Sequence, residues 1–418
     1  MRFQLNMYRE LTTKRVAIVL ALELAIVIAL GVLYDTDTQE PDVVIKNESN
    51  TEVETQVGGL PNTEIVGVGT EKDTANEQTS ESTEIDTSTE PDASTEPDEP
   101  ELVLNENPLT GEFNLTDGAV GKRPVAVMIN NVKKSMPQYG IAQADIIFEI
   151  PVEGFLTRFM AVYADYTQMP KICSIRSCRP YFPAIAKGFD AVYVYSGMAS
   201  QIRDYVNSLS LAVFEGGRNH GGLFGRDQER REAGYKLEHT MYFDGTGIVK
   251  AMEKRKIRSD IQEDNAGNAF LFQQTTELVR PDGDTCTWVE IDFGAATATL
   301  TYDIETNTYL KDFNGNPQVD GVEGTQLTFT NVFVLETTIK TASYGVHKDV
   351  DWHGGKGYYI SNGAKQEITW SKVDEESPLQ FFDMDGNELR INRGKSYIAI
   401  NRKGRTEYKE MVTEDMIR

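Results

Sequence analysis

The sequence is poor in cysteine and histidine, with three cysteines and four histidines in 418 residues. Because three is an odd number, at least one of Cys173, Cys178 and Cys286 is a free thiol or pairs between chains, and the sequence does not decide whether a disulfide forms. The chain also lacks GxSxG, HExxH, SxxK with its partner motifs, a Walker loop and a dinucleotide fingerprint. We therefore expect none of the common hydrolase, β-lactamase or nucleotide sites, no metal and no cofactor.

Positive charge is also scarce, because 41 Lys and Arg face 65 Asp and Glu. Residues 35–104 hold twenty of the acidic residues, only two lysines, and no Phe, Tyr or Trp. A segment of this composition cannot bury enough apolar surface to fold, so we expect a disordered acidic stalk at 35–104. A basic surface is not evident, and we expect no nucleic-acid partner.

Only one apolar run is long enough to cross a membrane. It covers residues 16–34, and its 19 residues match a hydrocarbon core of ~30 Å at ~1.5 Å per residue. Four basic residues precede it, which predicts a cytoplasmic tail at 1–15 and a body outside the cell. We expect a single-pass anchor in the cell membrane. A cleavable signal peptide is the alternative, and the length of the run weakens it.

Residues 105–258 alternate between strand and helix patterns. Apolar runs bounded by turn signals predict strands at 122–131, 146–152, 158–163, 172–176, 190–195 and 211–214. Helical composition predicts helices at 180–187, 201–209 and 248–257, the last of them basic. This alternation predicts an N-terminal domain that is an α/β layered sandwich.

Residues 259–284 are polar without a helical period and predict a connection. The part from 285 to 418 has short β-branched and aromatic runs at 288–293, 297–302, 309–313, 326–335, 357–360, 367–373, 379–382 and 396–401. Turn signals such as Asn314-Gly315 separate several of them. We predict a C-terminal, mostly antiparallel β domain at 285–418, and hence the α+β class for the whole body.

Several motifs in this order resemble the YerB family. They are NPLTG at 107–111, RPVAVMINN at 123–131, ADIIFE, VEG and TR within 144–158, IRSCR at 175–179, GRD at 225–227, GKGYYISNG at 355–363, ITW at 368–370 and DGNELRINRGKSYI at 385–398. The resemblance implies an extracytoplasmic protein of Gram-positive bacteria with a two-domain α+β body, and it supplies no established activity.

The chain departs from the family pattern in two places. Family members typically carry a lipoprotein cysteine, whereas this chain has an apolar run without one. Members also tend to show Pro-His-Asn where this chain reads Glu238-His239-Thr240, so only the histidine is retained.

Arginines are the best candidates for a ligand site. Arg176 and Arg179 stand where a predicted strand gives way to a helix N-terminus, which favours an anion. Ligands of α/β sheets gather at strand ends, so we predict one pocket formed by Arg158, Arg176, Arg179, Arg226, Glu149 and His239. Internal pairing of these arginines with Glu149, Glu153 or Asp227 is the alternative.

Two acidic patterns offer other chemistry. Glu149 and Glu153 share a face of one predicted strand and are candidates for a catalytic acid and base, although Pro151 between them favours an edge or a bulge. His347, Asp349, Asp351 and His353 recur with period 2 and could bind zinc, but the flanking glycines favour a solvated hairpin tip.

These observations favour a non-catalytic, membrane-anchored module of the cell envelope that holds an anionic wall component or an envelope partner protein. The alternative is a cell-wall hydrolase that uses Glu149 and Glu153.

Overall fold

The computed structural model describes residues 105–218, 220–262 and 270–411. The predicted cytoplasmic tail, anchor and stalk at 1–104 lie outside the described residues. Within those ranges, no helix is both long enough and apolar enough to cross a membrane.

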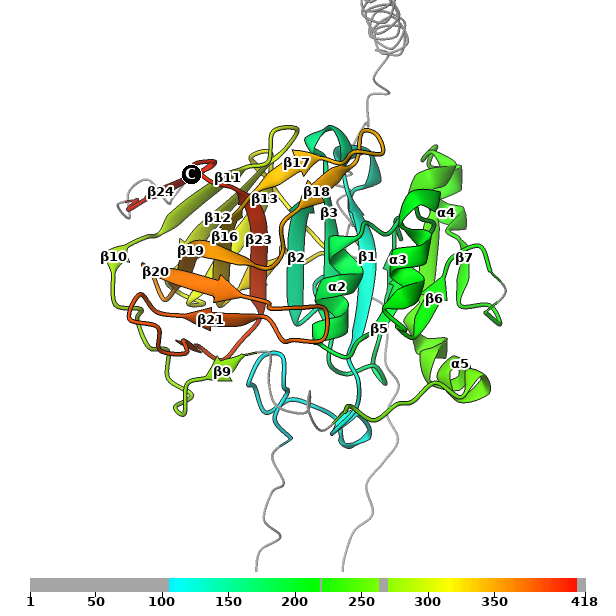
Figure 1. Cartoon of the computed structure of the whole chain (residues 1–418), viewed down its shortest axis with the longest axis horizontal. Coiled ribbons are helices and arrows are strands. Elements are labelled where there is room, and N and C mark those ends of the chain that lie inside the picture. Colours follow the sequence, from blue (N-terminus) through cyan, green and yellow to red (C-terminus); the bar gives the residue numbers. More distant parts are fainter. Residues whose placement is uncertain (1–104, 219, 263–269, 412–418) are drawn as a thin grey trace, which may run out of the picture. The chain divides into compact units, whose positions relative to one another are not determined.

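The N-terminal half is a mixed sheet (Figure 1), and helices pack on both of its faces. Its strands are β1 (Val125–Asn131), β2 (Ile146–Pro151), β3 (Thr157–Tyr163), β5 (Val192–Tyr195) and β6 (Val213–Glu215), in the order β2-β3-β1-β5-β6. Every residue of β1, β2 and β3 is buried, which explains their continuous apolar runs. The helices are α2 (Tyr181–Gly188), α3 (Arg203–Ser208), α4 (Gln228–Glu232) and the predicted basic helix α5 (Ile248–Arg255).

The same sheet continues into the C-terminal half. Strand β23 (Ser396–Arg402) pairs in parallel with β2, from Ile146 opposite Ser396 to Glu149 opposite Ala399. Beyond it lie β16 (Asn331–Thr337), β19 (Gly354–Ser361), β20 (Ala364–Ser371), β10 (Asp284–Thr285) and β21 (Gln380–Phe382), which complete eleven strands. The two halves therefore share one hydrogen-bonded sheet.

A second, antiparallel sheet of six strands packs on the face opposite to α2 and α3. It contains β11 (Trp288–Asp292), β12 (Thr297–Asp303), β13 (Thr308–Phe313), β14 (Asn316–Pro317), β15 (Thr328–Phe329) and β24 (Thr406–Lys409). The smaller sheets are β4 (Lys171–Cys173) with β8 (Met241–Asp244) and β7 (Phe224–Arg226), β9 (Leu271–Phe272) with β22 (Arg390–Ile391), and the hairpin β17 (Ile339–Thr341) with β18 (Lys348–Val350). The predicted α+β class, with an α/β half and a mostly antiparallel β half, is confirmed.

The large sheet separates two apolar cores. Side chains alternate between its faces, so Phe148 of β2 packs with the helices while the neighbouring Ile147 packs with the six-stranded sheet. Helix α2 contributes Phe182 to the first core, and β11 contributes Val289 to the second. The large sheet thus lies between α2 and α3 on one face and the six-stranded sheet together with α5 on the other.

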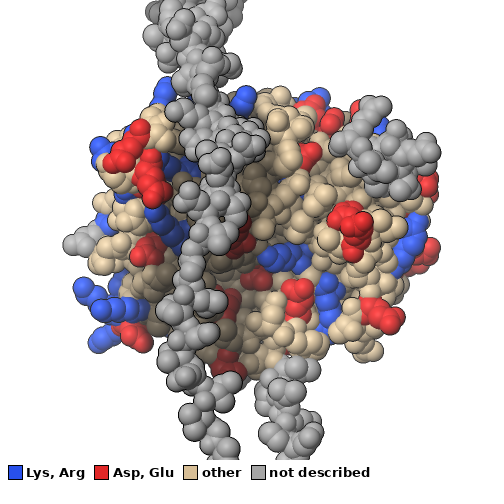
Figure 2. Space-filling view, turned by 180° about the vertical axis from the view of Figure 1, so that it is seen from behind, with Lys and Arg blue, Asp and Glu red and all other residues tan. Residues whose placement is uncertain are grey.

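The face opposite to that of Figure 1 carries both signs of charge. Figure 2 shows acidic and basic side chains interspersed over much of the visible surface. Basic side chains gather at its lower left, the side on which α5 lies, and the last turn of α5 carries Lys254 and Arg255.

Candidate binding site

Seven strands of the large sheet run in the same direction and end at one edge, namely β1, β2, β5, β6, β16, β20 and β23. The pairs β1–β5, β5–β6, β2–β23 and β16–β23 are parallel, and β3 runs antiparallel to both β1 and β2. Their carboxyl ends, together with the start of β3, form what we call the carboxyl edge. Of the residues predicted for the ligand site, Arg158 lies at the start of β3, Arg176 and Arg179 lie between β4 and α2, and Arg226 ends β7.

Arg158 and Arg179 converge at this edge on one carboxylate, Glu153. Arg158 Nη2 donates to Glu153 Oε1 at 2.7 Å, and Arg179 makes a bidentate contact of 2.5 Å and 2.9 Å with the same carboxylate. Each arginine also donates a hydrogen bond to a backbone carbonyl. Arg158 Nη1 donates to the carbonyl of Ser177, and Arg179 Nη1 donates to the carbonyl of Cys178. Two nearly buried arginines therefore share one negative charge.

The shared carboxylate leaves this cluster with an excess of positive charge. Burial by itself raises the pKa of Glu153, but Arg158 and Arg179 outweigh burial and lower that pKa to about 2. Burial, assisted by repulsion from Arg179, lowers the pKa of Arg158 to about 10. The charged form of Arg158 is thus less favourable than in water, and an additional anion would stabilise it.

Arg176, Arg226 and His239 form a second cluster around the turn at 237–239. Arg176 Nη2 donates to Glu238 Oε2 at 2.7 Å, and Arg226 Nη1 donates to the carbonyl of Leu237 at 2.5 Å. His239 Nδ1 lies 2.9 Å from the side-chain nitrogen of Asn130, at the end of β1. Burial lowers the pKa of His239, which favours the neutral ring. The predicted pocket is therefore divided between two neighbouring clusters.

Glu149 belongs to neither cluster, which corrects the prediction that placed it with the arginines and with Glu153. Its side chain is fully buried between the two sheets, on the opposite face of the large sheet. It accepts hydrogen bonds from Asn131, Thr157 and Tyr397 at 2.6–2.8 Å, and Lys311 Nζ of β13 lies 3.3 Å from it.

Strand register explains this separation. Glu149 lies opposite Phe159 in the β2–β3 pair, whereas Arg158 lies opposite Ile150, so Glu149 and Arg158 point to opposite faces. Strand β2 ends at Pro151, and the short 3-10 turn Glu153–Phe155 brings Glu153 to Arg158 on the face covered by α2. The period-2 relation between Glu149 and Glu153 is broken there, and the structure does not bring the two carboxylates together.

The remaining candidate groups have structural surroundings. All three cysteines are free and buried, and burial raises the pKa of Cys173 to about 11, so a reactive thiolate is disfavoured. The segment with His347 and His353 forms the hairpin β17–β18 and the residues that follow it, as the flanking glycines indicate. Among the described residues no group of three His, Cys, Asp or Glu side chains is arranged to hold a metal ion.

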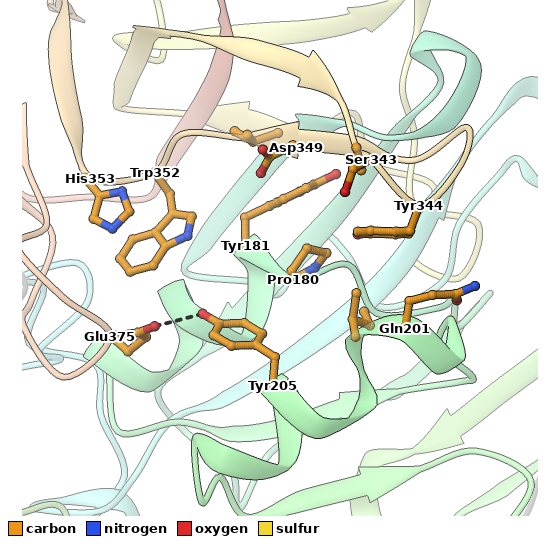
Figure 3. Close-up of a pocket in the computed structure, with 13 residues that line it drawn as sticks. Pro180, Tyr181, Gln201, Tyr205, Ser343, Tyr344, Asp349, Trp352, His353 and Glu375 are labelled. Atoms are coloured by element: carbon orange, nitrogen blue, oxygen red, sulfur yellow. Dashed lines mark hydrogen bonds between the residues drawn. The ribbon is translucent and has the colours of Figure 1, made fainter.

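A groove of about 420 Å³ lies beside α2, and the sequence analysis missed it. Its walls come from the start of α2, from α3 with the segment leading into it, from the hairpin β17–β18 with the residues after it, and from Glu375 in the loop after β20 (Figure 3). Its aromatic lining residues are Tyr181, Tyr205, Tyr344 and Trp352. Because these residues are far apart in the sequence and follow no common motif, no local signal identifies them.

Comparisons with known proteins agree with this architecture. "Protein of unknown function (DUF3048) N-terminal domain" matches residues 109–258, and "Protein of unknown function (DUF3048) C-terminal domain" matches 289–398. The chain is 30% identical to "Putative lipoprotein YerB" of Bacillus subtilis (strain 168) over 302 residues, which are 70% of this chain and 85% of that protein.

A solved structure extends the comparison to the fold. The crystal structure of the YerB protein from Bacillus subtilis has a TM-score of 0.63 and 26% sequence identity, and the match covers 72% of this chain and 99% of that chain. Sequence and fold thus lead to the same group of proteins. This chain belongs to the YerB family.

Proposed function

We propose that this chain is a membrane-anchored, extracytoplasmic binding module of the cell envelope that holds an anionic wall component and catalyses no reaction. The observation that carries the proposal is the excess of cations at the carboxyl edge. The ion pairs of Arg158, Arg176 and Arg179 involve only Glu153 and Glu238 among the described residues. One guanidinium group is therefore left for a further anion.

Two more cations support the same reading. Phe155, two residues after Glu153, has Lys348 Nζ at 3.9 Å from its ring centroid and the Arg402 guanidinium at 4.2 Å. Within the described part of the chain, the Nε atoms of Arg176 and Arg402 have no hydrogen-bond partner. We call Arg158, Arg176, Arg179, Lys348 and Arg402 the cationic edge. Arg176 is more available to a ligand than Arg158 and Arg179, since a quarter of its side chain is exposed whereas theirs are 6% exposed.

The location outside the cell rests on two supports. The apolar run at 16–34 has the length and the preceding basic residues of a single-pass anchor. The relative from Bacillus subtilis is called a lipoprotein, and a lipid anchor would hold a body at the same face of the membrane. Protease added to intact protoplasts should remove the body. A body that stays protected would contradict the proposed topology.

The ligand is tested by sedimentation with isolated cell walls. The full-length chain, purified in detergent, should cosediment with walls, and Arg176→Ala should reduce the bound fraction. No muropeptides should be released during the incubation, because the structure does not bring Glu149 and Glu153 together as an acid–base pair. Sustained release that depends on Glu153 would overturn the non-catalytic part of the proposal. Binding that is unchanged in Arg176→Ala would overturn the site.

A further inference from the structure

The groove beside α2 differs in chemistry from the cationic edge. Figure 3 shows Glu375 beside Tyr205 with Trp352 and His353 above them, and Tyr344 with Gln201 on the other side. Its 420 Å³ falls in the ~300–1,000 Å³ range of ligand sites. A second hollow of about 400 Å³ shares Asp349, Val350, Trp352 and His353 with it. The space is therefore larger than one side chain would fill.

Two carboxylates face this space without a cation. Neither Asp349 nor Glu375 forms an ion pair with a Lys, Arg or His of the described ranges. Glu375 accepts a hydrogen bond from Tyr205 OH at 3.1 Å, which fixes one oxygen and orients the carboxylate beside the ring. The groove thus combines aromatic rings with two carboxylates that form no ion pair within the described ranges.

Lys340 lines the second hollow and lies opposite Asp349 in the β17–β18 pair, but the two side chains form no ion pair, and the other nearby cations are held elsewhere. Lys372 Nζ lies 5.5 Å from the Trp352 ring, but its side chain is buried and donates to three backbone carbonyls. Arg158 and Arg179 do not line the groove, and they hold Glu153 between them. None of these groups neutralises Asp349 or Glu375 by direct contact.

We infer that this groove binds the ammonium group of a lysine-type side chain presented by a peptide. Aromatic rings attract a cation through their negative faces, and a carboxylate adds a charge-assisted hydrogen bond to the same ammonium. A peptide fits better than a small free amine, because the second hollow continues past Trp352 and can hold the residues that flank the lysine. The inference concerns a surface separate from the cationic edge and does not rest on the proposed function.

The test uses three peptides that differ only at the side-chain nitrogen. Acetyl-Gly-Lys-Gly-amide carries the ammonium, its Nε-acetyl form removes the charge, and acetyl-Gly-norleucine-Gly-amide removes the nitrogen. Affinity is measured with the full-length chain in detergent by calorimetry. The lysine peptide should bind at least tenfold more tightly than either analogue, since one charge-assisted contact corresponds to about a tenfold difference or more.

Variants of the carboxylates separate this site from others. Glu375→Gln and Asp349→Asn should each weaken binding of the lysine peptide about tenfold and leave binding of the acetylated peptide unchanged. Glu376→Gln is the matched control, because Glu376 pairs with Lys187 and does not line the groove. Equal affinity for the three peptides, no binding at millimolar concentration, or an equal loss in Glu376→Gln would each overturn the inference.

Discussion

Lys311→Met tests the buried link between the two sheets. Lys311 and Glu149 are both completely buried, and their charged atoms lie 3.3 Å apart. Lys311 also donates to Gln318 Oε1 at 2.7 Å. Burial lowers the pKa of Lys311, and the attraction of Glu149 opposes this shift. Because the pair joins β2 of the large sheet to β13 of the small sheet, its loss should affect the stability of the whole body.

The expected magnitude follows from what remains after the substitution. Methionine approximates the aliphatic part of lysine, so little packing is lost, but Glu149 becomes a buried charge without a cation. Removal of one partner of such a pair typically costs ~3–5 kcal/mol. Glu149 keeps its hydrogen bonds from Asn131, Thr157 and Tyr397, which places the expected loss near the lower end of that range.

Urea denaturation followed by tryptophan fluorescence measures this loss. Glu149→Gln combined with Lys311→Met should be more stable than the sum of the two single losses implies, because neither charge is then left alone. The coupling energy should approach the upper end of ~0.5–3 kcal/mol. Lys365→Met is the control, since its ion pair with Asp284 is exposed and should contribute little. Additive losses, or a loss below ~1 kcal/mol for Lys311→Met, would refute the reasoning.

Three further predictions concern other buried groups. The two arginines lower the pKa of Glu153 from 4.5 to about 2, so its ion pairs should stabilise the fold fully above about pH 4.5 and lose that contribution as the pH falls towards 2. Glu153→Gln should therefore flatten the dependence of the urea midpoint on pH in this window. An unchanged pH dependence would contradict the lowered pKa. Arg230 lies between the rings of Tyr139 and Tyr235 and donates to three carbonyls, so Arg230→Lys should lower the urea midpoint, whereas the exposed Arg231→Lys should not. Burial raises the pKa values of Cys173 and Cys286 to about 11, so iodoacetamide should label the native chain much more slowly than the chain in urea, and equal rates would refute this.

The strands of the large sheet were predictable because burial on both faces leaves continuous apolar runs. The predicted strand at 146–152 is β2 (Ile146–Pro151), and the one at 158–163 is β3 (Thr157–Tyr163). The parallel pairing of β2 with β23 was not predictable, since backbone hydrogen bonds between distant segments leave no local pattern. Sequence reasoning therefore separated two halves that one sheet connects.

The candidate site was predicted in part. Arg158 and Arg179 do meet, because Arg158 lies at the start of β3 and Arg179 lies just before α2, at the same edge of the sheet. Glu149 was misplaced because a polar residue in a buried strand resembles a site residue until its distant partner, Lys311, is known. The groove beside α2 had no sequence signal, since its walls are assembled from four separate segments.

The affinity of the full-length chain for a soluble polyanion tests the central claim most directly. The probe is poly(glycerol phosphate), titrated by calorimetry against the wild type, Arg176→Ala and Lys254→Ala. Lys254 lies in α5, away from the carboxyl edge, and its substitution removes the same charge. The cationic edge predicts that Arg176→Ala weakens binding about tenfold or more, and that Lys254→Ala leaves it nearly unchanged. Equal losses in the two variants, or no binding by the wild type, would contradict the account.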